Sequence, residues 1–334
     1  MPDIIDVDVH DEVALREWYD VWRAGQPHRP PELVPSWESA RVPLSTPRDD
    51  FDVSLFGLRE AGSLVGAALL NLPMADNPTV AYADLMTHAG HRRRGIGTTL
   101  LAELERRARD AGRERLLTEV FVPAGRETEV TGDQRFAESR GYVVANREGM
   151  KAVRLDRAEG LWPPLEAEVA DALGDYRVVT WRDACPDEYV ESFGDAVSRV
   201  MSLIPQGDLD LDDREWSVDE IRTAERHRKE IGLVTIESAA ISPDGTVVGL
   251  TGIRANRADP LVARIGVTMV LPEHRGHRLG LATKLASHRA LREQVPACEL
   301  VVTSNAEVNT HMNAINERMG YVQLETLVEY HRLL

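Results

Sequence analysis

The chain has 334 residues, which is enough for two domains of about 150 residues each. Its 55 acidic and 39 basic residues give a formal net charge of −16, which argues against nucleic acid as the main partner, because binding phosphate needs a basic face. We expect a cytoplasmic protein without a membrane partner. The two cysteines are far apart in the sequence, and the acidic amino-terminal segment is unlike a signal peptide. No apolar run approaches the ~20 residues that span a bilayer.

The first half of the chain alternates strand and helix patterns. A hairpin turn is predicted at Glu60-Ala61-Gly62 between two apolar runs. A helix is predicted from Gly97, since Leu100 and Leu104 recur at helical spacing before Gly112 offers a stop. Strands are expected at 52–60, 63–73, 80–88, 115–123 and 142–155, with a short helix ending at Gly141.

The second half repeats this order, with two landmarks at nearly constant offsets. Gly97 and Gly280 are 183 positions apart, and the Gly-Tyr pairs that begin at Gly141 and Gly320 are 179 apart. We therefore predict a duplicated domain, with the boundary near Pro163-Pro164, because two prolines break regular elements. Strands are expected at 177–183, 233–241, 246–255, 262–271, 298–305 and 321–334, with helices at 281–291 and 311–319.

Two related glycine- and arginine-rich turns precede the predicted helices, "HRRRGIGT" at 91–98 and "HRGHRLGLAT" at 274–283. A helix amino terminus has unpaired N–H groups and a favourable dipole for anions, and glycine allows close approach, so such a turn suits a pyrophosphate. A solvated basic turn is the alternative for one isolated copy. Neither a P-loop nor a dinucleotide fingerprint fits the sequence.

The strand, Arg92-x-x-Gly95-x-Gly97 and the following helix resemble motif A of the GNAT superfamily of acetyl-CoA-dependent N-acetyltransferases. The second half resembles the same family over a longer span, through Gly320-Tyr321. The resemblance implies two tandem α/β domains, 1–160 and 161–334, each a mixed, mostly antiparallel sheet flanked by helices. It also implies that acetyl-CoA binds where two parallel strands splay apart.

By this resemblance, backbone and side-chain groups of both halves are candidate coenzyme contacts. In the first half these are Met86, Thr87, Arg92, Arg93, Arg94, Gly95, Ile96, Gly97 and Thr98. In the second half they are Met269, Val270, Arg275, Gly276, His277, Arg278, Leu279, Gly280, Leu281, Ala282, Asn305 and Asn309.

The sequence departs from the family pattern at three places. Arg278 stands where the 183-residue offset expects the glycine found at Gly95, so either its backbone contact is lost or the turn shifts by one residue. The first half lacks counterparts of Asn305 and Asn309. The tyrosine that protonates the departing thiolate in many members is replaced by Ala137 in one half and by Asn316 in the other, so Asn316 marks the catalytic position without being an acid.

Candidate general bases are Asp84, on the strand before motif A, and Glu237, on a hairpin strand of the second half. For each, an exposed strand carboxylate is the alternative. The acidic segment 206–220 is either a lip for a cationic amine or a solvated loop that ends in a capping box of Ser217 and Glu220. No metal site is predicted.

We expect an N-acetyltransferase that acts on a primary amine of a small, cationic metabolite such as an aminoglycoside, polyamine or amino sugar. The second half has the fuller motif set and is expected to be catalytic, and the first half to be a degenerate copy that can still hold coenzyme A. The alternatives are acetylation of lysine or amino termini of proteins and peptides, or a non-catalytic acyl-CoA sensor. A monomer or homodimer is expected.

Overall fold

The computed structural model describes residues 3–126 and 128–334, which divide into two compact units. Unit 1 comprises residues 1–147, 207–210 and 325–334, and unit 2 comprises 148–206 and 211–324, within those described ranges. These limits differ from a cut at residue 160, because residues 148–160 belong to unit 2, whereas residues 207–210 and 325–334 belong to unit 1.

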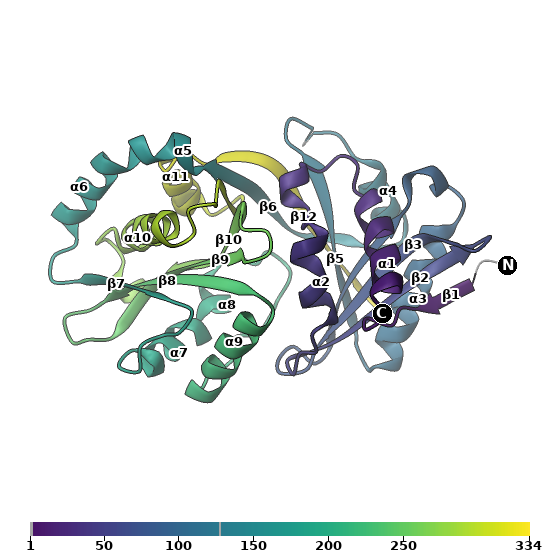
Figure 1. Cartoon of the computed structure of the whole chain (residues 1–334), viewed down its shortest axis with the longest axis horizontal. Helices are drawn as coiled ribbons and strands as arrows, with labels where there is room; N and C mark the ends of the chain where they lie inside the picture. The colour runs from purple at the N-terminus through teal and green to yellow at the C-terminus, as the bar shows by residue number, and fades with distance from the viewer. Residues whose placement is uncertain (1–2, 127) are drawn as a thin grey trace. The chain divides into compact units, whose positions relative to one another are not determined.

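Unit 1 is built on a mixed sheet in the order β1-β2-β3-β4-β5-β12 (Figure 1). All of its strand pairs are antiparallel except β4 and β5, which are parallel. The strands are β1 (Asp3–Asp6), β2 (Phe51–Glu60), β3 (Ser63–Pro73), β4 (Val80–Thr87), β5 (Arg115–Pro123) and β12 (Val322–Leu333).

Helices cover both faces of this sheet. One face packs on α3 through a buried cluster that includes Leu100 and Leu104, as the helical spacing predicts, and the other packs on α1 and α2 through a cluster that includes Trp18. The helices are α1 (Glu12–Ala24), η1 (Pro31–Leu33), α2 (Trp37–Ser45), η2 (Ala89–His91), α3 (Ile96–Asp110) and α4 (Gly132–Ser139).

Unit 2 repeats the plan in the order β7-β8-β9-β10-β11-β6. Here β10 and β11 are the parallel pair, and the other neighbours are antiparallel. This confirms the predicted fold class. The strands are β6 (Val143–Arg154), β7 (Arg177–Arg182), β8 (Leu233–Ile241), β9 (Val247–Asn256), β10 (Val262–Val270) and β11 (Leu300–Ala306).

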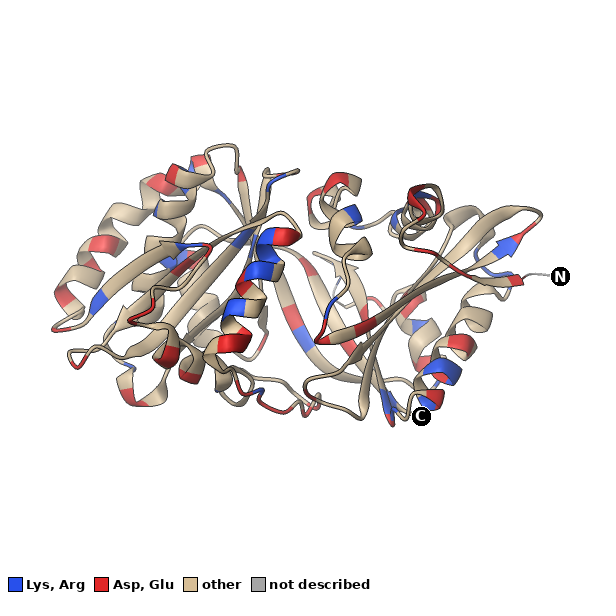
Figure 2. Cartoon of the chain, turned by 60° about the horizontal axis from the view of Figure 1, so that its bottom comes forward, with Lys and Arg blue, Asp and Glu red and all other residues tan. Residues whose placement is uncertain are grey.

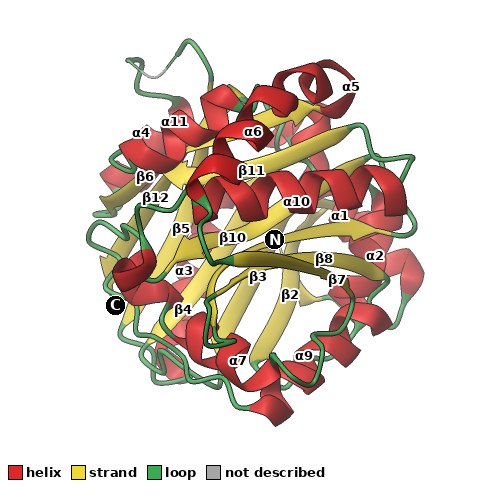
Figure 3. Ribbon diagram, turned by 90° about the vertical axis from the view of Figure 1, so that its left-hand side faces the viewer, coloured by secondary structure: helices red, strands yellow, loops and turns green. Residues whose placement is uncertain are grey.

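The helices of unit 2 also lie on both faces of its strands, with α6 and α10 on one side and α7 and α9 on the other (Figures 1 and 3). They are α5 (Leu155–Ala158), η3 (Glu159–Leu161), α6 (Trp162–Ala172), α7 (Val190–Ser198), α8 (Val200–Leu203), α9 (Val218–Glu230), η4 (Pro272–His274), α10 (Leu279–Gln294) and α11 (Thr310–Arg318).

The expectation that Pro163-Pro164 breaks the chain between domains is wrong. Both prolines lie in the first turn of α6, where the missing N–H costs nothing because first-turn amides have no intrahelical partner. Trp162 and Leu165 beside them are buried in the core of unit 2. The segment is therefore part of that core and not a linker.

The last strand of each repeat completes the sheet of the other unit. Residues 325–333 of β12, from the end of the chain, pair with β5 of unit 1 over nine residues. Residues 148–154 of β6, which follow α4 in the first repeat, pair with β11 of unit 2. The order of elements along the chain predicts that each strand closes its own half, which is wrong, because the pattern and length of a strand do not reveal its pairing partner.

Some helices carry both acidic and basic residues, as α9 does, where Glu225 and Glu230 flank Arg226, Arg228 and Lys229, whereas α6 and α7 carry acidic residues without Lys or Arg (Figure 2). Within the ranges 3–126 and 128–334, none of the helices has the length and apolarity needed to cross a bilayer.

Candidate active site

In both units the parallel strands separate after three paired residues. β4 and β5 are paired only from Val80 to Tyr82, whereas β4 remains paired with β3 as far as Thr87. β10 and β11 are paired only from Val262 to Arg264, whereas β10 follows β9 to Val270. The far edge of β4 and of β10 is thereby opened, and its backbone amides are available to a ligand.

The turn after each opened strand has the same backbone in both units, although its residues differ. Arg93 and Gly95 have φ of 66° and 86°, and their counterparts at an offset of 183, Gly276 and Arg278, have φ of 96° and 57°. The arginine and the glycine have therefore exchanged places over two left-handed positions. The turn of unit 2 does not shift by a residue, because Arg278 adopts the left-handed conformation that Gly95 adopts more easily.

Each turn leads into a helix without a side-chain cap. The N-cap of α3 is Gly95, which has no side chain, and the N-cap of α10 is Arg278, whose side chain makes no capping hydrogen bond. The first helical N–H groups of both helices therefore have no side-chain acceptor at the cap. An added Cβ at Gly97 would lie 3.6 Å from Thr87 Oγ1, so the first turn of α3 lies close to the end of β4. An uncapped amino terminus beside an opened strand fits a pyrophosphate followed by an extended arm, which is the shape of coenzyme A.

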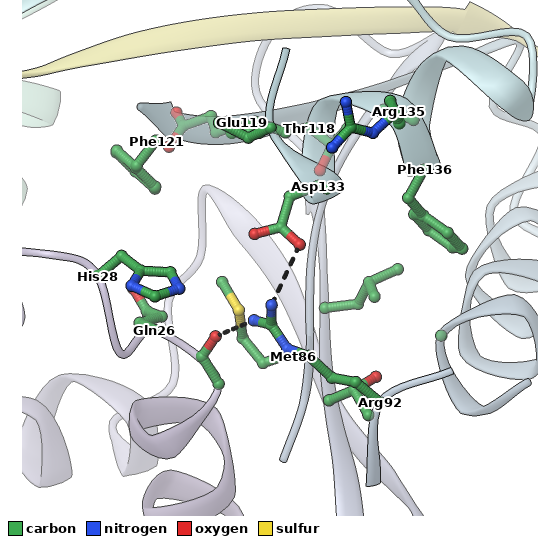
Figure 4. Close-up of a pocket in the computed structure, with 18 of the residues that line it drawn as sticks. Gln26, His28, Met86, Arg92, Thr118, Glu119, Phe121, Asp133, Arg135 and Phe136 are labelled. Carbon is green, nitrogen blue, oxygen red and sulfur yellow. Dashed lines mark hydrogen bonds and ion pairs between the residues drawn. The ribbon is translucent and has the colours of Figure 1, made fainter. Parts of the chain in front are cut away.

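The arginines of these turns have different partners. Arg92 donates from Nη2 to Gly25 O at the end of α1 (2.7 Å) and lies 3.6 Å from Asp133 (Figure 4). Arg275 donates to Val270 O (3.3 Å), and Arg278 forms an ion pair with Glu168 of α6 (2.8 Å). The side chain of Arg278 would have to leave Glu168 to reach a phosphate, so its contribution there is the backbone conformation.

A pocket of about 1190 Å³ lies in unit 1 over these groups, which is large for a ligand site. It is lined by the end of β4, the motif A turn, β5, and the segment from 126 to 140 that contains α4. Figure 4 shows Arg92 and Asp133 on one side, with His28, Glu119 and Phe121 farther along. Of the nine predicted residues of unit 1, eight line it: Met86, Thr87, Arg92, Arg93, Gly95, Ile96, Gly97 and Thr98. Arg94 is not among the lining residues and lies 4.0 Å from Glu60.

The two candidate bases lie in the same row of their sheets, on different strands. In unit 1, Leu55, Leu69 and Asp84 face one another across β2, β3 and β4. Asp84 comes from β4, the strand that parts from β5. Its carboxylate accepts a hydrogen bond from Trp22 Nε1 (2.6 Å), and burial raises its pKa against the effects of Trp22 and Arg29.

In unit 2 the corresponding row is Glu237, Gly252 and Val267 across β8, β9 and β10, and Val267 is the counterpart of Asp84 at the offset of 183. A Cβ at Gly252 would lie 2.7 Å from Glu237 Oε1, so the carboxylate occupies the space over this glycine and extends toward β10. Glu237 is buried, and its Oε2 has no hydrogen-bond partner. Burial raises the pKa of Glu237, opposed by the charges of Arg254 and Arg228.

The asparagines predicted in the second half have structural partners. Asn309 is the N-cap of α11 and accepts from the amide of Met312 (3.2 Å). Asn316 is fully buried and donates from Nδ2 to Asn305 (2.6 Å), while its Oδ1 has no partner. Asn305 and Asn316 are thus brought together, and Asn309 stabilises the helix next to them.

Two groups near these residues were missed from sequence. Lys284 and His288 lie on the buried face of α10 and are fully buried. A lysine and a histidine four residues apart in an amphipathic helix resemble a solvated face, and only their place in the fold shows that they lie inside the unit.

The acidic segment is divided between the two units. Residues 207–210 belong to unit 1, where the amide of Asp208 donates to Ala145 O (2.8 Å), and the segment from 211 belongs to unit 2. Asp213 accepts from the amide of Ser202 (2.9 Å). The predicted capping box of Ser217 and Glu220 is confirmed at the start of α9. The lip for a cationic amine stays a prediction.

Comparison with known proteins agrees with this geometry. Residues 14–142 match the model of the acetyltransferase (GNAT) family. A solved structure described as a tandem GNAT protein from the clavulanic acid biosynthesis pathway, without acetyl-CoA, matches with a TM-score of 0.80 and 25% identity over 100% of this chain and 98% of that one. Residues 14–142 thus match a GNAT acetyltransferase domain, and the whole chain has the fold of a tandem GNAT protein. Acetyltransferases with this fold use acetyl-CoA as co-substrate.

Two curated relatives of this tandem GNAT protein are named mycothiol acetyltransferase. That of Stackebrandtia nassauensis is 28% identical over 83% of this chain and 82% of its own, and that of Saccharomonospora viridis is 28% identical over 81% and 80%. A GCN5-related N-acetyltransferase from Sphaerobacter thermophilus shares the fold, with a TM-score of 0.65 and 15% identity.

Proposed function

We propose that this tandem GNAT protein transfers an acetyl group from acetyl-CoA to the primary amine of a small, cationic metabolite, and that unit 2 carries out the transfer. The observation that carries this proposal is the buried Glu237 carboxylate, which lies over Gly252 and extends toward the opened strand β10. A primary amine is mostly protonated near neutral pH and must lose a proton before it can attack, so a base is needed beside the opened strand.

We assign the transfer to unit 2 because the carboxylate of Glu237 has fewer hydrogen-bond partners than the carboxylate of Asp84. Glu237 Oε2 has no hydrogen-bond partner, whereas Asp84 Oδ2 accepts from Trp22. Burial raises the pKa of Glu237, and a carboxylate with a raised pKa is, in its ionised form, a stronger base than an ordinary carboxylate. An ionised carboxylate also attracts the cationic form of the amine before it takes the proton.

The chain's own groups fit the co-substrate in both units. The uncapped first turns of α3 and α10 would hold the pyrophosphate, and the opened edges at Met86-Thr87 and Met269-Val270 would bind the extended arm. When bound, acetyl-CoA supplies the thioester that the amine attacks. Backbone amides at the opened edge of β10 are placed to stabilise the negative charge that develops on the thioester oxygen.

The class of acceptor is inferred from charge and from the relatives. The net charge of −16 attracts cations. Two relatives over most of their length are named mycothiol acetyltransferase, so mycothiol without its acetyl group is one acceptor to test, beside aminoglycosides, polyamines and other amino sugars.

The experiment is thiol release from acetyl-CoA by the purified chain with each of these amines and with lysine peptides. Release with one small-amine class supports the proposal, and release with peptides alone would replace it with protein acetylation. Acetyl-CoA binding without release for any amine would instead favour a non-catalytic sensor.

A further inference from the structure

Unit 2 contains a lysine that has no exposure to solvent and no hydrogen bond at its side-chain nitrogen. Lys284 lies in the second turn of α10, six residues after the N-cap of that helix. Its Nζ lies 5.2 Å from the centre of the Tyr321 ring. A buried ammonium without a hydrogen-bonded partner is costly, so its presence calls for a role beyond packing.

The groups around Lys284 do not neutralise it. Lys151 of β6 is the charged group that acts on it most strongly, and this repulsion adds to burial in lowering the pKa of Lys284 to about 7. Lys151 itself donates to Asn313 (2.6 Å), and Glu317 of α11 acts on Lys151. His288, one turn farther along α10, is kept neutral because burial lowers its pKa to about 3.

The hydroxyl of Tyr321 is already engaged. His288 Nδ1 lies 2.6 Å from the carbonyl of Lys284, which can only accept, so Nδ1 carries the proton. His288 Nε2 therefore accepts from the Tyr321 hydroxyl at 2.7 Å. Burial also raises the pKa of Tyr321 well above its ordinary value. Tyr321 is thus a donor to His288 and not to a ligand.

The duplicated fold indicates what Lys284 faces. Three positions in unit 1, Leu101, Ala137 and Tyr142, line the pocket over the motif A turn. At the offsets of 183 and 179, the same three positions in unit 2 are Lys284, Asn316 and Tyr321. An apolar leucine and an alanine of the pocket are therefore replaced by two buried polar residues, and both Lys284 Nζ and Asn316 Oδ1 have no hydrogen-bond partner.

We propose that Lys284 is the proton donor to the thiolate that leaves when unit 2 transfers the acetyl group. This inference rests on the proposed function. In the step, a bond forms between the amine nitrogen and the acetyl carbon, and the bond between that carbon and sulfur breaks. Before the attack, Glu237 takes one proton from the protonated amine and passes it to solvent. In the transfer, the sulfur takes a proton from the Lys284 ammonium and leaves as the thiol of coenzyme A, while the second proton lost by the nitrogen passes to Glu237. Solvent then returns a proton to Lys284 and takes one from Glu237.

The chemistry favours a lysine of this kind over the residues that flank it. An aliphatic thiol has a pKa near 8.5, so an ammonium that titrates near 7 gives its proton to the thiolate in the favourable direction. Asn316, at the position of the tyrosine in the family, cannot donate an acidic proton but can accept a hydrogen bond from the ammonium. In unit 2 the acid would therefore be Lys284 of α10, because Asn316 of α11 cannot act as one.

The test compares Lys284→Met, which keeps the length of the side chain without its charge, with Lys229→Met, which removes an exposed lysine of α9. We expect Lys284→Met to lower kcat by about 100-fold, to leave the KM for acetyl-CoA within about threefold, and to remove the fall in kcat above about pH 7. Lys229→Met should match the wild type. Removing a buried charge should not unfold the chain, and Lys284→Gln provides a second variant.

A second readout does not depend on turnover. The thiol of bound coenzyme A is titrated by the ultraviolet absorbance of its thiolate, and affinities for coenzyme A and for its analogue without sulfur are compared across pH. In the wild type, the pKa of the coenzyme A thiol bound in one site should be at least about one unit below that of free coenzyme A. In Lys284→Met, the pKa of the bound thiol should return to the value of free coenzyme A. An unchanged titration and an unchanged pH profile would overturn the assignment. If no amine is acetylated, the proposed function fails, and the thiol titration still decides whether Lys284 faces the sulfur.

Discussion

Glu237 on β8 faces Gly252 on β9, and its carboxylate lies in the volume that any side chain at position 252 would occupy. The same row in unit 1 has Leu55, Leu69 and Asp84. In unit 1 the carboxylate of this row comes from the third strand, β4, and in unit 2 it comes from the first strand, β8. Gly252 on the middle strand of unit 2 leaves space for the Glu237 side chain to extend toward the third strand, β10. The two repeats keep the location of the charge while changing the residue that supplies it.

Gly252→Ala should therefore impair the base without removing it. The new Cβ would lie 2.8 Å from Glu237 Cδ, so the carboxylate must turn away from β10. We expect kcat to fall at least about tenfold, with the affinity for acetyl-CoA unchanged, since misplacement of a catalytic group costs rate before binding. Gly160→Ala, where an added Cβ meets no atom within 4 Å, is the control. Full activity of Gly252→Ala would show that the contact does not position the base.

Glu237→Gln should change the pH profile as well as the rate. The base must be ionised, and burial raises its pKa, so wild-type kcat/KM should fall as pH decreases through that raised value. Gln has the same size and cannot take a proton. We expect a loss of at least ~100-fold and the disappearance of the acidic limb that belongs to Glu237. Full activity with an unchanged acidic limb would assign the base to another residue.

The same substitution should affect stability in the opposite direction. A carboxyl group with a folded-state pKa above its ordinary 4.5 favours the folded state while it is protonated, and this contribution is lost as pH rises through the folded value. Thermal unfolding should therefore show Glu237→Gln equal to the wild type near pH 4.5 and more stable than the wild type at pH 8. A variant that is less stable at pH 8 would mean that Arg254 and Arg228 outweigh burial.

The left-handed turns predict unequal effects of substitution in the two units. Gly95→Ala places a Cβ at φ 86° in open space, so the cost is backbone strain alone, about 1–2 kcal/mol. Arg278→Gly relieves the same strain at φ 57° and loses an exposed ion pair with Glu168, which is worth roughly 0–1 kcal/mol. Urea unfolding should show the first variant destabilised and the second within about 1 kcal/mol of the wild type. Equal destabilisation of both would show that the turns are not equivalent.

Arg92→Ala and Arg275→Ala should distinguish the two proposed coenzyme sites. Each guanidinium is at the start of a motif A turn, and removing a charged donor to a phosphate costs about 1.5–3 kcal/mol, or roughly 10- to 100-fold in affinity. Calorimetric titration with coenzyme A should show a lower affinity at one class of sites in each single variant and a lower affinity at both classes in the double variant. Unchanged affinity in both single variants would contradict the phosphate sites.

Much of the fold follows from local sequence patterns. The hairpin at Glu60-Ala61-Gly62, the strand over 80–87 and the helix that begins after Gly95 were predicted because their signals lie within a few residues of each other. The short strand β1 was missed, since four residues with acidic ends carry no period. The motif A residues of unit 1 were predicted together and, except for Arg94, line one pocket, because one turn and the first turn of the helix that follows supply them.

The rest depends on pairs of residues far apart in the chain. Nothing near Gly252 indicates that its missing side chain serves Glu237, 15 positions earlier, because only the register of β8 and β9 brings them together. The burial of Lys284 depends on Tyr321 and on Lys151, which come from other elements. Sequence identified the candidate base and not the glycine or the lysine that would complete its site.

The exchange of the last strands governs how the chain can be made. When the first repeat has left the ribosome, β5 still lacks β12, the strand that pairs with it over nine residues and that follows α11 in the second repeat. An unpaired strand edge then remains exposed through the synthesis of roughly the whole second repeat, and such edges promote association between chains. The amino-terminal unit can complete its sheet only after the second repeat has been synthesised, so the two repeats depend on each other in folding.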